Sequence, residues 1–187
     1  MAKVTTNPII EGFRGAVGNL VFKRYGGGTI VSRKGDPSST PPTEGQKAVR
    51  DKFKLAALYG KTVMADPATK ELYTTTAKAK GKPAFALALA DFFNEPMVDE
   101  IDLAAYTGKA GDPIKVRAHD DFELTGVAVA IRDADGNVVE EGAAAIGTDG
   151  AFLYTAQKTL ATGQQVVIEV TATDRPGHKT TKKQPKG

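Results

Sequence analysis

Hydrophobic and polar positions follow three different patterns along the 187-residue chain. Residues 18–34 hold two β-prone runs around three glycines, residues 43–95 repeat apolar positions at helical spacing, and residues 98–182 alternate in short runs. These patterns predict an α+β protein with an N-terminal arm and β-hairpin, a short helical segment and a C-terminal antiparallel β-sandwich. The segments are residues 1–42 for the arm, hairpin and proline-rich linker, 43–95 for the helices, 96–183 for the sandwich and 184–187 for a tail.

The hairpin is the stretch on which the interpretation of the whole chain depends. Its two runs flank the glycines at 26–28, a composition typical of a β-hairpin. A lone two-stranded ribbon is only marginally stable in water, and no third strand-like run lies next to it in the sequence. We therefore expect the ribbon to pack on the helices, on another copy of the protein or on a polyanion.

The first helix is predicted to begin at a capping box formed by Thr43 and Gln46. It can continue to about Met64. Apolar or small residues at helical spacing give it one face suited to packing, formed by Val49, Phe53, Ala56, Ala57 and Gly60.

Two further helices are predicted after the first. Asp66 and Pro67 are a typical N-cap and first helical residue, and this second helix is expected to end near Gly81 with Leu72 as its main apolar anchor. Pro83 then opens a short, very apolar helix over residues 84–93. A helix this short and apolar is a core element, because it cannot span a membrane.

Short alternating runs separated by turn signals fill the rest of the chain. The Asp135-Gly136 pair between two such runs is a strong hairpin signal. Seven short strands at this spacing predict an antiparallel sandwich. The predicted strands are Val98–Leu103, Ile114–His119, Leu124–Arg132, Val138–Glu141, Ala151–Thr155, Gln165–Thr173 and His178–Lys182.

Two parts of the chain resemble known families. The block from Val98 to Lys183, with its runs Ile131–Val138 and Val170–Gly177, resembles the immunoglobulin-like domains of bacterial and phage surface proteins. This resemblance implies a fold and says little about function. The N-terminal half is similar to a family of uncharacterised proteins associated with Bacteroidota and their mobile elements, and this similarity implies no activity. It is carried by residues 15–21 and 42–53.

Composition narrows the class of protein. Hydrophobic residues make up 41% and charged residues 25% of the chain, as in folded globular proteins. The absence of cysteine excludes disulfide scaffolds, thiolate metal sites and cysteine nucleophiles. The sequence shows no apolar signal region or membrane-spanning run, so we expect no membrane insertion. A cytoplasmic location or a place in an assembled extracellular or virion-like particle fits these features.

Charge is distributed unevenly along the chain. Residues 1–83 carry 15 Lys and Arg against 6 Asp and Glu, a net charge of +9, whereas residues 84–187 carry 10 against 16, a net charge of −6. Such a split indicates either attraction between copies arranged head to tail, simple solvation, or an N-terminal half that faces nucleic acid.

The arm and hairpin carry the candidate binding residues. Phe13 and Phe22 are interleaved with the cations there, and stacking aromatics with cations suit single-stranded nucleic acid. The alternative is that Phe22 and Leu20, which share one face of the ribbon, are core and the cations are solvated or guard an exposed edge. The candidate nucleic-acid-binding residues are Arg14, Lys23, Arg24, Tyr25, Arg33 and Lys34.

Candidate catalytic or metal chemistry is weak. His119 and His178 lack the spacing of zinc ligands and are expected at the surface, and no Gly-x-Ser-x-Gly nucleophile motif occurs. Asp133, Asp135 and Asn137 resemble the start of a calcium loop, but the twelfth position lacks the required glutamate, so a turn is the simpler interpretation. We expect no catalytic residue, no metal, no cofactor and no small-molecule substrate.

The sequence therefore favours a non-enzymatic structural protein that assembles with copies of itself into a filament or virion-like particle. Strand addition from the N-terminal arm to a neighbouring sheet edge is the expected mechanism. Outward small residues of the sandwich, Ala128 and Ala130, offer a further docking surface. The alternative is a protein that coats nucleic acid through its basic N-terminal half.

Overall fold

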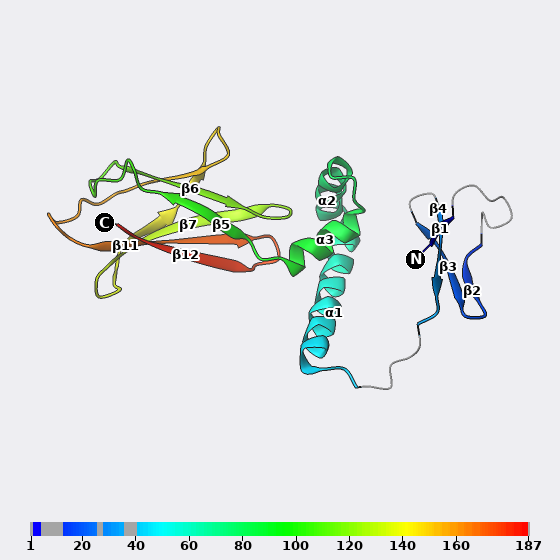
Figure 1. Cartoon of the computed structure of the whole chain (residues 1–187). Helices are drawn as coiled ribbons and strands as arrows, with labels where there is room; N and C mark the ends of the chain where they lie inside the picture. The colour runs from blue at the N-terminus through cyan, green and yellow to red at the C-terminus, as the bar shows by residue number, and fades with distance from the viewer. Residues whose placement is uncertain (1, 5–12, 26–27, 36–40, 187) are drawn as a thin grey trace. The chain divides into compact units, whose positions relative to one another are not determined.

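A computed structural model describes residues 2–4, 13–25, 28–35 and 41–186 (Figure 1). The chain forms two compact units, residues 1–44 and residues 45–187. The described residues form three helices and three antiparallel sheets, which confirms the expected α+β class. No helix in the described ranges is both long enough and apolar enough to cross a lipid bilayer.

The first unit contains a four-stranded antiparallel sheet. Its strands are β1 (Ala2–Val4), β2 (Gly15–Val17), β3 (Leu20–Tyr25) and β4 (Gly28–Arg33). Their order in space is β1-β4-β3-β2. The predicted hairpin is thus confirmed as β3 and β4, and the glycines at 26 and 27 lie outside the described residues.

The expectation that this ribbon lacks further strands is wrong. Both short strands of the arm pair with it: β1 lies along β4, and β2 lies along β3. Gly18 makes the turn into β3 at a φ of +58°, a conformation that favours glycine. Strands of three residues are too short to show alternation, so periodicity did not reveal them.

Three helices open the second unit: α1 (Glu44–Ala65), α2 (Pro67–Ala79) and α3 (Ala84–Phe93). The predicted start of α2 is confirmed, because the Asp66 carboxylate accepts a hydrogen bond from the Thr69 backbone N–H at 2.8 Å. The bounds of α3 match the predicted ones. These helices and residues 94–96 lead directly into the first strand of the sandwich.

The buried side of the helices differs from the predicted one in two places. Leu72 is 48% exposed, and its neighbour Tyr73 is fully buried and anchors α2 instead. On α1, the predicted face is buried at Ala56 and Gly60, but Val49 and Phe53 remain exposed. The first turns of α1 therefore extend beyond the part that the other helices cover.

A β-sandwich forms the rest of the second unit. Its strands are β5 (Met97–Asp102), β6 (Pro113–His119), β7 (Leu124–Asp133), β8 (Val138–Ala143), β9 (Ala145–Ile146), β10 (Phe152–Thr155), β11 (Val166–Asp174) and β12 (Lys179–Lys186). One antiparallel sheet has the order β5-β6-β10-β9 and the other the order β12-β11-β7-β8. Alternate residues of β7 and β11, such as Val129 and Ile168, are buried between the sheets as predicted.

The last strand is longer than the sequence indicated. β12 pairs with β11 from Thr173 opposite Lys179 to Val166 opposite Lys186. Residues 184–186, which we expected in a tail, thus belong to the sheet. Polar side chains line this edge strand, so its residues lack the apolar alternation that marks the other strands.

Helices and sandwich share one hydrophobic contact region. The Tyr73 ring of α2 stacks on Phe122, in the loop after β6, with ring centroids 3.8 Å apart. Phe92 of α3 meets the His178 ring edge-on at 5.2 Å, in the turn before β12. Helices and sandwich therefore pack through the β6–β7 loop and the β11–β12 turn, consistent with one compact unit.

Close packing of α1 against α3 requires a glycine. A Cβ at position 60 would lie 2.8 Å from side-chain atoms of both Leu89 and Phe85. We expect Gly60→Ala to destabilise the second unit by about 0.5–2 kcal/mol, because the ends of Leu89 and of the exposed Phe85 must shift while alanine itself favours the helix. Gly45→Ala in the same helix is the matched control, since a Cβ there meets nothing within 4 Å. It should be stabilising by roughly 0.5–1 kcal/mol. Urea unfolding followed by circular dichroism measures both, and equal effects would contradict the packing described.

Candidate functional site

The N-terminal sheet has one predominantly apolar face. Residues directly opposite in neighbouring strands share a face, so the register places Leu20 and Phe22 of β3 beside Val17 of β2 and Val31 of β4. The Phe13 ring contacts Phe22 edge-on, with centroids 5.7 Å apart.

The described residues leave part of this face exposed, although Thr29, which shares the face, is buried. Val17 is 66% exposed and Phe13 51%, and Leu20 is also exposed. Among the described residues of this sheet whose side chains are placed, only Thr29 is buried. Contiguous exposed apolar side chains on a small sheet are a feature of interaction surfaces.

The predicted basic residues do not share one face. Arg24 and Arg33 lie in register on the apolar face, where Arg33 is opposite Leu20, whereas Lys23 lies on the other face with Ile30. Tyr25 ends β3 opposite Gly28. Arg14 directly precedes β2, and Lys34 follows β4.

All five cations are exposed, and residues 13–25 and 28–35 contain no acidic residue. None of the five forms an ion pair with an acidic residue in the described part of the chain. Their positive charge is therefore not neutralised by that part of the chain. The face with Phe13, Phe22, Arg24 and Arg33 combines aromatic and cationic groups, and Lys23 does not belong to it.

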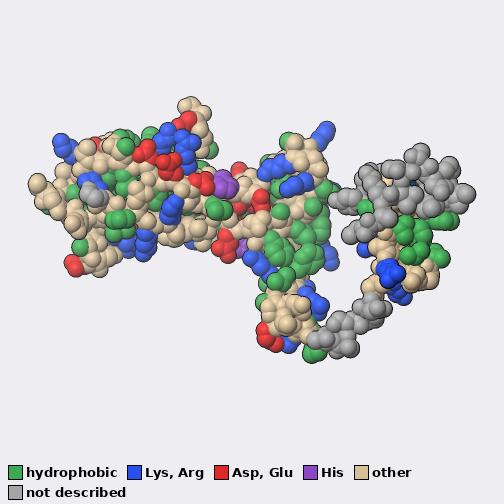
Figure 2. Space-filling model, viewed as in Figure 1, with side chains coloured by type: hydrophobic (Ala, Val, Ile, Leu, Met, Phe, Trp, Pro, Cys, Tyr) green, Lys and Arg blue, Asp and Glu red, His purple; other side chains and the backbone are tan. Residues whose placement is uncertain are grey.

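A second uncovered apolar surface lies on the helices (Figure 2). Val49 and Phe53 of α1 are 62% and 52% exposed, and Phe85 of α3 is also exposed. Phe53 contacts Phe93, the last residue of α3, at 6.1 Å between ring centroids. Lys52 lies over the same Phe93 ring at 5.6 Å, so the patch has a cationic rim.

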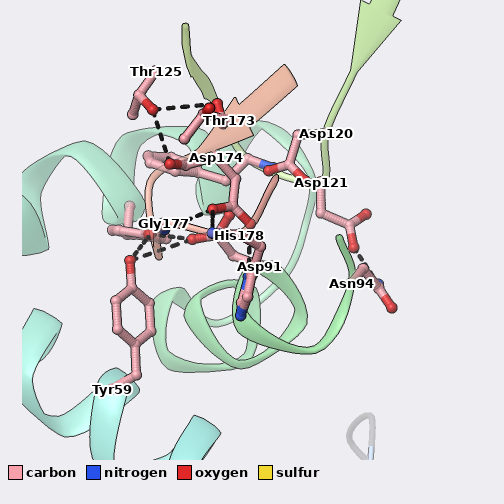
Figure 3. Close-up of polar contacts among 12 residues, drawn as sticks. Tyr59, Asp91, Asn94, Asp120, Asp121, Thr125, Thr173, Asp174, Gly177 and His178 are labelled. Atoms are coloured by element: carbon pink, nitrogen blue, oxygen red, sulfur yellow. Dashed lines mark hydrogen bonds and ion pairs between the residues drawn. The ribbon is translucent and has the colours of Figure 1, made fainter. Parts of the chain in front are cut away.

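A buried polar cluster occupies the junction of helices and sandwich (Figure 3). Asp91 of α3 is fully buried, and its Oδ2 accepts a hydrogen bond from the Tyr73 hydroxyl. The Tyr59 hydroxyl lies 2.8 Å from that of Tyr73 and 3.5 Å from the same carboxylate oxygen. Burial raises the pKa of Tyr73 far above its ordinary value, and the hydrogen bond to Asp91 acts in the same direction. Tyr73 therefore acts as a hydrogen-bond donor.

Asp174 organises the β11–β12 turn beside this cluster. Its Oδ1 accepts the backbone N–H groups of Gly177 at 2.7 Å and His178 at 2.6 Å, and its Oδ2 lies 2.8 Å from His178 Nδ1. The prediction that His178 is a surface residue is wrong, because its ring is half-buried against Phe92. His119 is exposed as expected and pairs with Asp99.

Sequence reasoning missed this cluster. The sequence did contain one signal for it. Asp91 is a carboxylate within the apolar run of residues 84–93, and a charged side chain in a core helix needs buried partners. Its partners come from other elements, so their spacing in the sequence carried no information.

The loop of residues 133–137, which resembles the start of a calcium loop, is a turn. The Asp133 carboxylate accepts hydrogen bonds from within this turn. Asp133 Oδ1 accepts the backbone N–H groups of Asp135 at 3.0 Å and Asn137 at 2.8 Å, and Oδ2 accepts the Asn137 side-chain amide at 3.1 Å. The hydrogen bonds from Asn137 lower the pKa of Asp133. Within the described ranges, no group of three or more histidine, aspartate or glutamate side chains is placed to hold a metal ion.

No protein-family model matches the chain, and no curated protein is similar enough to be counted as a relative. Solved structures do give matches. CopC from Methylosinus trichosporium OB3b is 20% identical over 49% of this chain and 90% of its own, with a TM-score of 0.37. A tetra-tandem repeat from the extending region of a large adhesion protein is 24% identical over 49% of this chain and 23% of its own, with a TM-score of 0.33. At these identities and TM-scores, the similarities say nothing about function.

Proposed function

We propose that the protein is a non-enzymatic structural subunit that assembles with copies of itself, into a filament or virion-like particle, through its N-terminal sheet. The observation that carries this proposal is the apolar face of that sheet, which the described residues leave exposed at Val17, Phe13 and Leu20. A sheet with one apolar face is stabilised when another element covers that face.

The expected gain is sufficient for weak association at each contact. Complete burial of one large apolar side chain contributes about 1.5–3 kcal/mol, and the half-exposed side chains here contribute roughly half of that each. Losses of translational and side-chain freedom offset part of this gain. Many copies are therefore needed for a stable assembly, and repeated contacts within a filament or shell supply them.

Charge favours contacts between unlike parts of two copies. Stacking two N-terminal sheets by the same face would bring Arg24 and Arg33 of both copies together, with no acidic residue on the described part of either sheet. Docking on the C-terminal half of a neighbour, where residues 84–187 carry a net charge of −6, avoids this repulsion. Such head-to-tail contacts form open filaments when the rotation between copies does not close a ring.

Face-to-face docking replaces strand addition in this proposal. The arm strands β1 and β2 already pair within their own sheet, so the arm does not need the sheet edge of a neighbour. Within the acidic half, Ile146 of β9 and Leu153 of the neighbouring β10 are exposed apolar side chains that can receive this face.

We also infer that the sandwich is an immunoglobulin-like domain. Its two sheet orders, β5-β6-β10-β9 and β12-β11-β7-β8, correspond to strands A-B-E-D and G-F-C-C′ of that fold. Domains of this kind serve many unrelated functions, so the assignment supports an architecture and adds no activity.

Coating of nucleic acid is the second candidate function. It is supported by the exposed Arg24 and Arg33 on the face that also carries Phe13 and Phe22. Arginine and aromatic groups together bind single strands without reading base sequence. Both functions are compatible in a nucleoprotein filament.

Val17→Asp tests the assembly surface, because it places a charge on the apolar face of β2. We expect the wild-type protein to form large species whose size grows with concentration, and the variant to elute as a much smaller species. Ala16→Asp is the matched control, since Ala16 is the exposed neighbour on the opposite face. Size-exclusion chromatography with light scattering measures both. A wild-type monomer at all concentrations, or equal loss of assembly in both variants, would overturn the proposal.

Replacing Lys23, Arg24, Arg33 and Lys34 with Gln separates the two functions. If nucleic acid is bound, the variant should lose absorbance at 260 nm relative to 280 nm, and added salt should release nucleic acid from the wild type. If assembly is independent of nucleic acid, the particle size should persist after nuclease treatment. The protein contains no Trp and five Tyr, so bound nucleic acid dominates this absorbance ratio.

A further inference from the structure

Asp91 has one carboxylate oxygen with partners and one without. Its side chain is fully buried, and Oδ2 receives the Tyr73 hydroxyl hydrogen bond described above. Its Oδ1 is buried and has no hydrogen-bond partner in the described part of the molecule. A buried acceptor without a donor lowers the free energy of unfolding, so we expect this oxygen to have a donor.

Asp120 of the sandwich also has a buried carboxylate oxygen without a hydrogen-bond partner in the described part of the molecule. It lies in the loop after β6, where its Oδ2 accepts the Phe122 backbone N–H at 3.1 Å. The oxygen without a partner among the residues described is its Oδ1. Figure 3 shows Asp120 and Asp91 at the same junction, where the charge of Asp120 acts on Asp91. One buried, unpartnered carboxyl oxygen from the helices and one from the sandwich thus lie at this junction.

Among the described residues, neither Asp91 nor Asp120 forms an ion pair with a cationic side chain. Tyr59 of α1 and Tyr73 of α2 donate hydrogen bonds without carrying charge. Arg175, in the β11–β12 turn, pairs with Glu123 at 2.8 Å. In the same turn, Asp174 adds a like charge and already pairs with His178. Two ionised carboxylates in this setting would repel each other, whereas one proton between them supplies the missing donor.

We propose that a proton shared between Asp91 and Asp120 stabilises the packing of the helices against the sandwich. The proton sits on one carboxyl group and is donated to the unpartnered oxygen of the other, so both orphan oxygens gain a partner. When the pH rises, the proton leaves to solvent, two negative charges face each other, and the junction loosens. This device is independent of the assembly proposed above.

The electrostatics of Asp91 agree with the geometry. Burial raises the pKa of Asp91 to about 7 from an ordinary 3.8, with Asp120 and Asp174 acting in the same direction and the Tyr73 hydrogen bond opposing. The folded state therefore holds about one more proton than the unfolded state between pH 4 and pH 7. The stabilising effect is complete below pH 4, is lost as the pH rises towards 7, and stays absent above it.

The wild-type unfolding constant should therefore rise about tenfold for each pH unit between roughly pH 4.5 and pH 7, beyond the change that other groups cause. Asp91→Asn removes the titrating group, because its amide can donate to Asp120 and its carbonyl can accept from Tyr73. The variant should lose this one-proton slope. Asp135→Asn, in an exposed turn, should keep the slope. Urea unfolding at a series of pH values measures all three proteins.

Carbon-13 NMR of the Asp91 carboxyl group tests the proposal on the wild-type protein. The proposal can therefore still be tested if the Asp91→Asn variant does not fold. We expect this carboxyl to titrate near pH 7, and amide hydrogen exchange in α3 and the β6–β7 loop to quicken above that pH more than the intrinsic rate predicts. A carboxyl titration near pH 4 would overturn the proposal. An Asp91→Asn variant that keeps the wild-type pH slope would overturn it as well.

Discussion

The stack of Tyr73 on Phe122 is the contact on which the second unit depends. It brings an aromatic ring of α2 against the loop that joins β6 to β7, at 3.8 Å between ring centroids. The same tyrosine reaches Asp91 of α3 with its hydroxyl, so a single side chain connects two helices and the sandwich. Without it, the helices would contact the sandwich through Phe92 against His178 and through the hydrogen bonds of Lys80 and Asn94 to Asp121.

A different constraint governs the first unit. Its sheet has four strands, of which two contain only three residues, and in the described residues it buries little besides Thr29. Small sheets become stable when a second layer covers their apolar face. The chain thus combines a C-terminal unit with an extensive buried core and an N-terminal sheet that leaves Val17, Phe13 and Leu20 exposed. This contrast gives the assembly proposal its physical basis.

Local signals were the reliable part of the sequence. Asp66 and Pro67 set the start of α2, and Asp135-Gly136 set the turn between β7 and β8, because a cap and a turn depend only on neighbouring residues. Period-two alternation likewise gave the buried face of β7 and β11. The choice between Leu72 and Tyr73 as anchor could not be made, since the partner ring of Tyr73 comes from position 122.

The candidate site shows the same limit. Lys23 and Arg24 are neighbours in the sequence, and the strand period alone places them on opposite faces. The face on which Phe13 lies depends on the pairing of β2 with β3. This pairing could not be predicted, because a strand of three residues shows no alternation. The Asp91 cluster draws on all three helices and on two sandwich loops, so only the fold brings it together.

The polar character of β12 protects one edge of the sandwich. β12 is an edge strand, and Lys179, Lys183 and Pro185 are exposed along it. Lysine and proline on an edge strand prevent another strand from extending the sheet, because a charge would be desolvated and a backbone donor is missing. This edge of the sandwich is therefore a poor template for pairing with a strand of another chain.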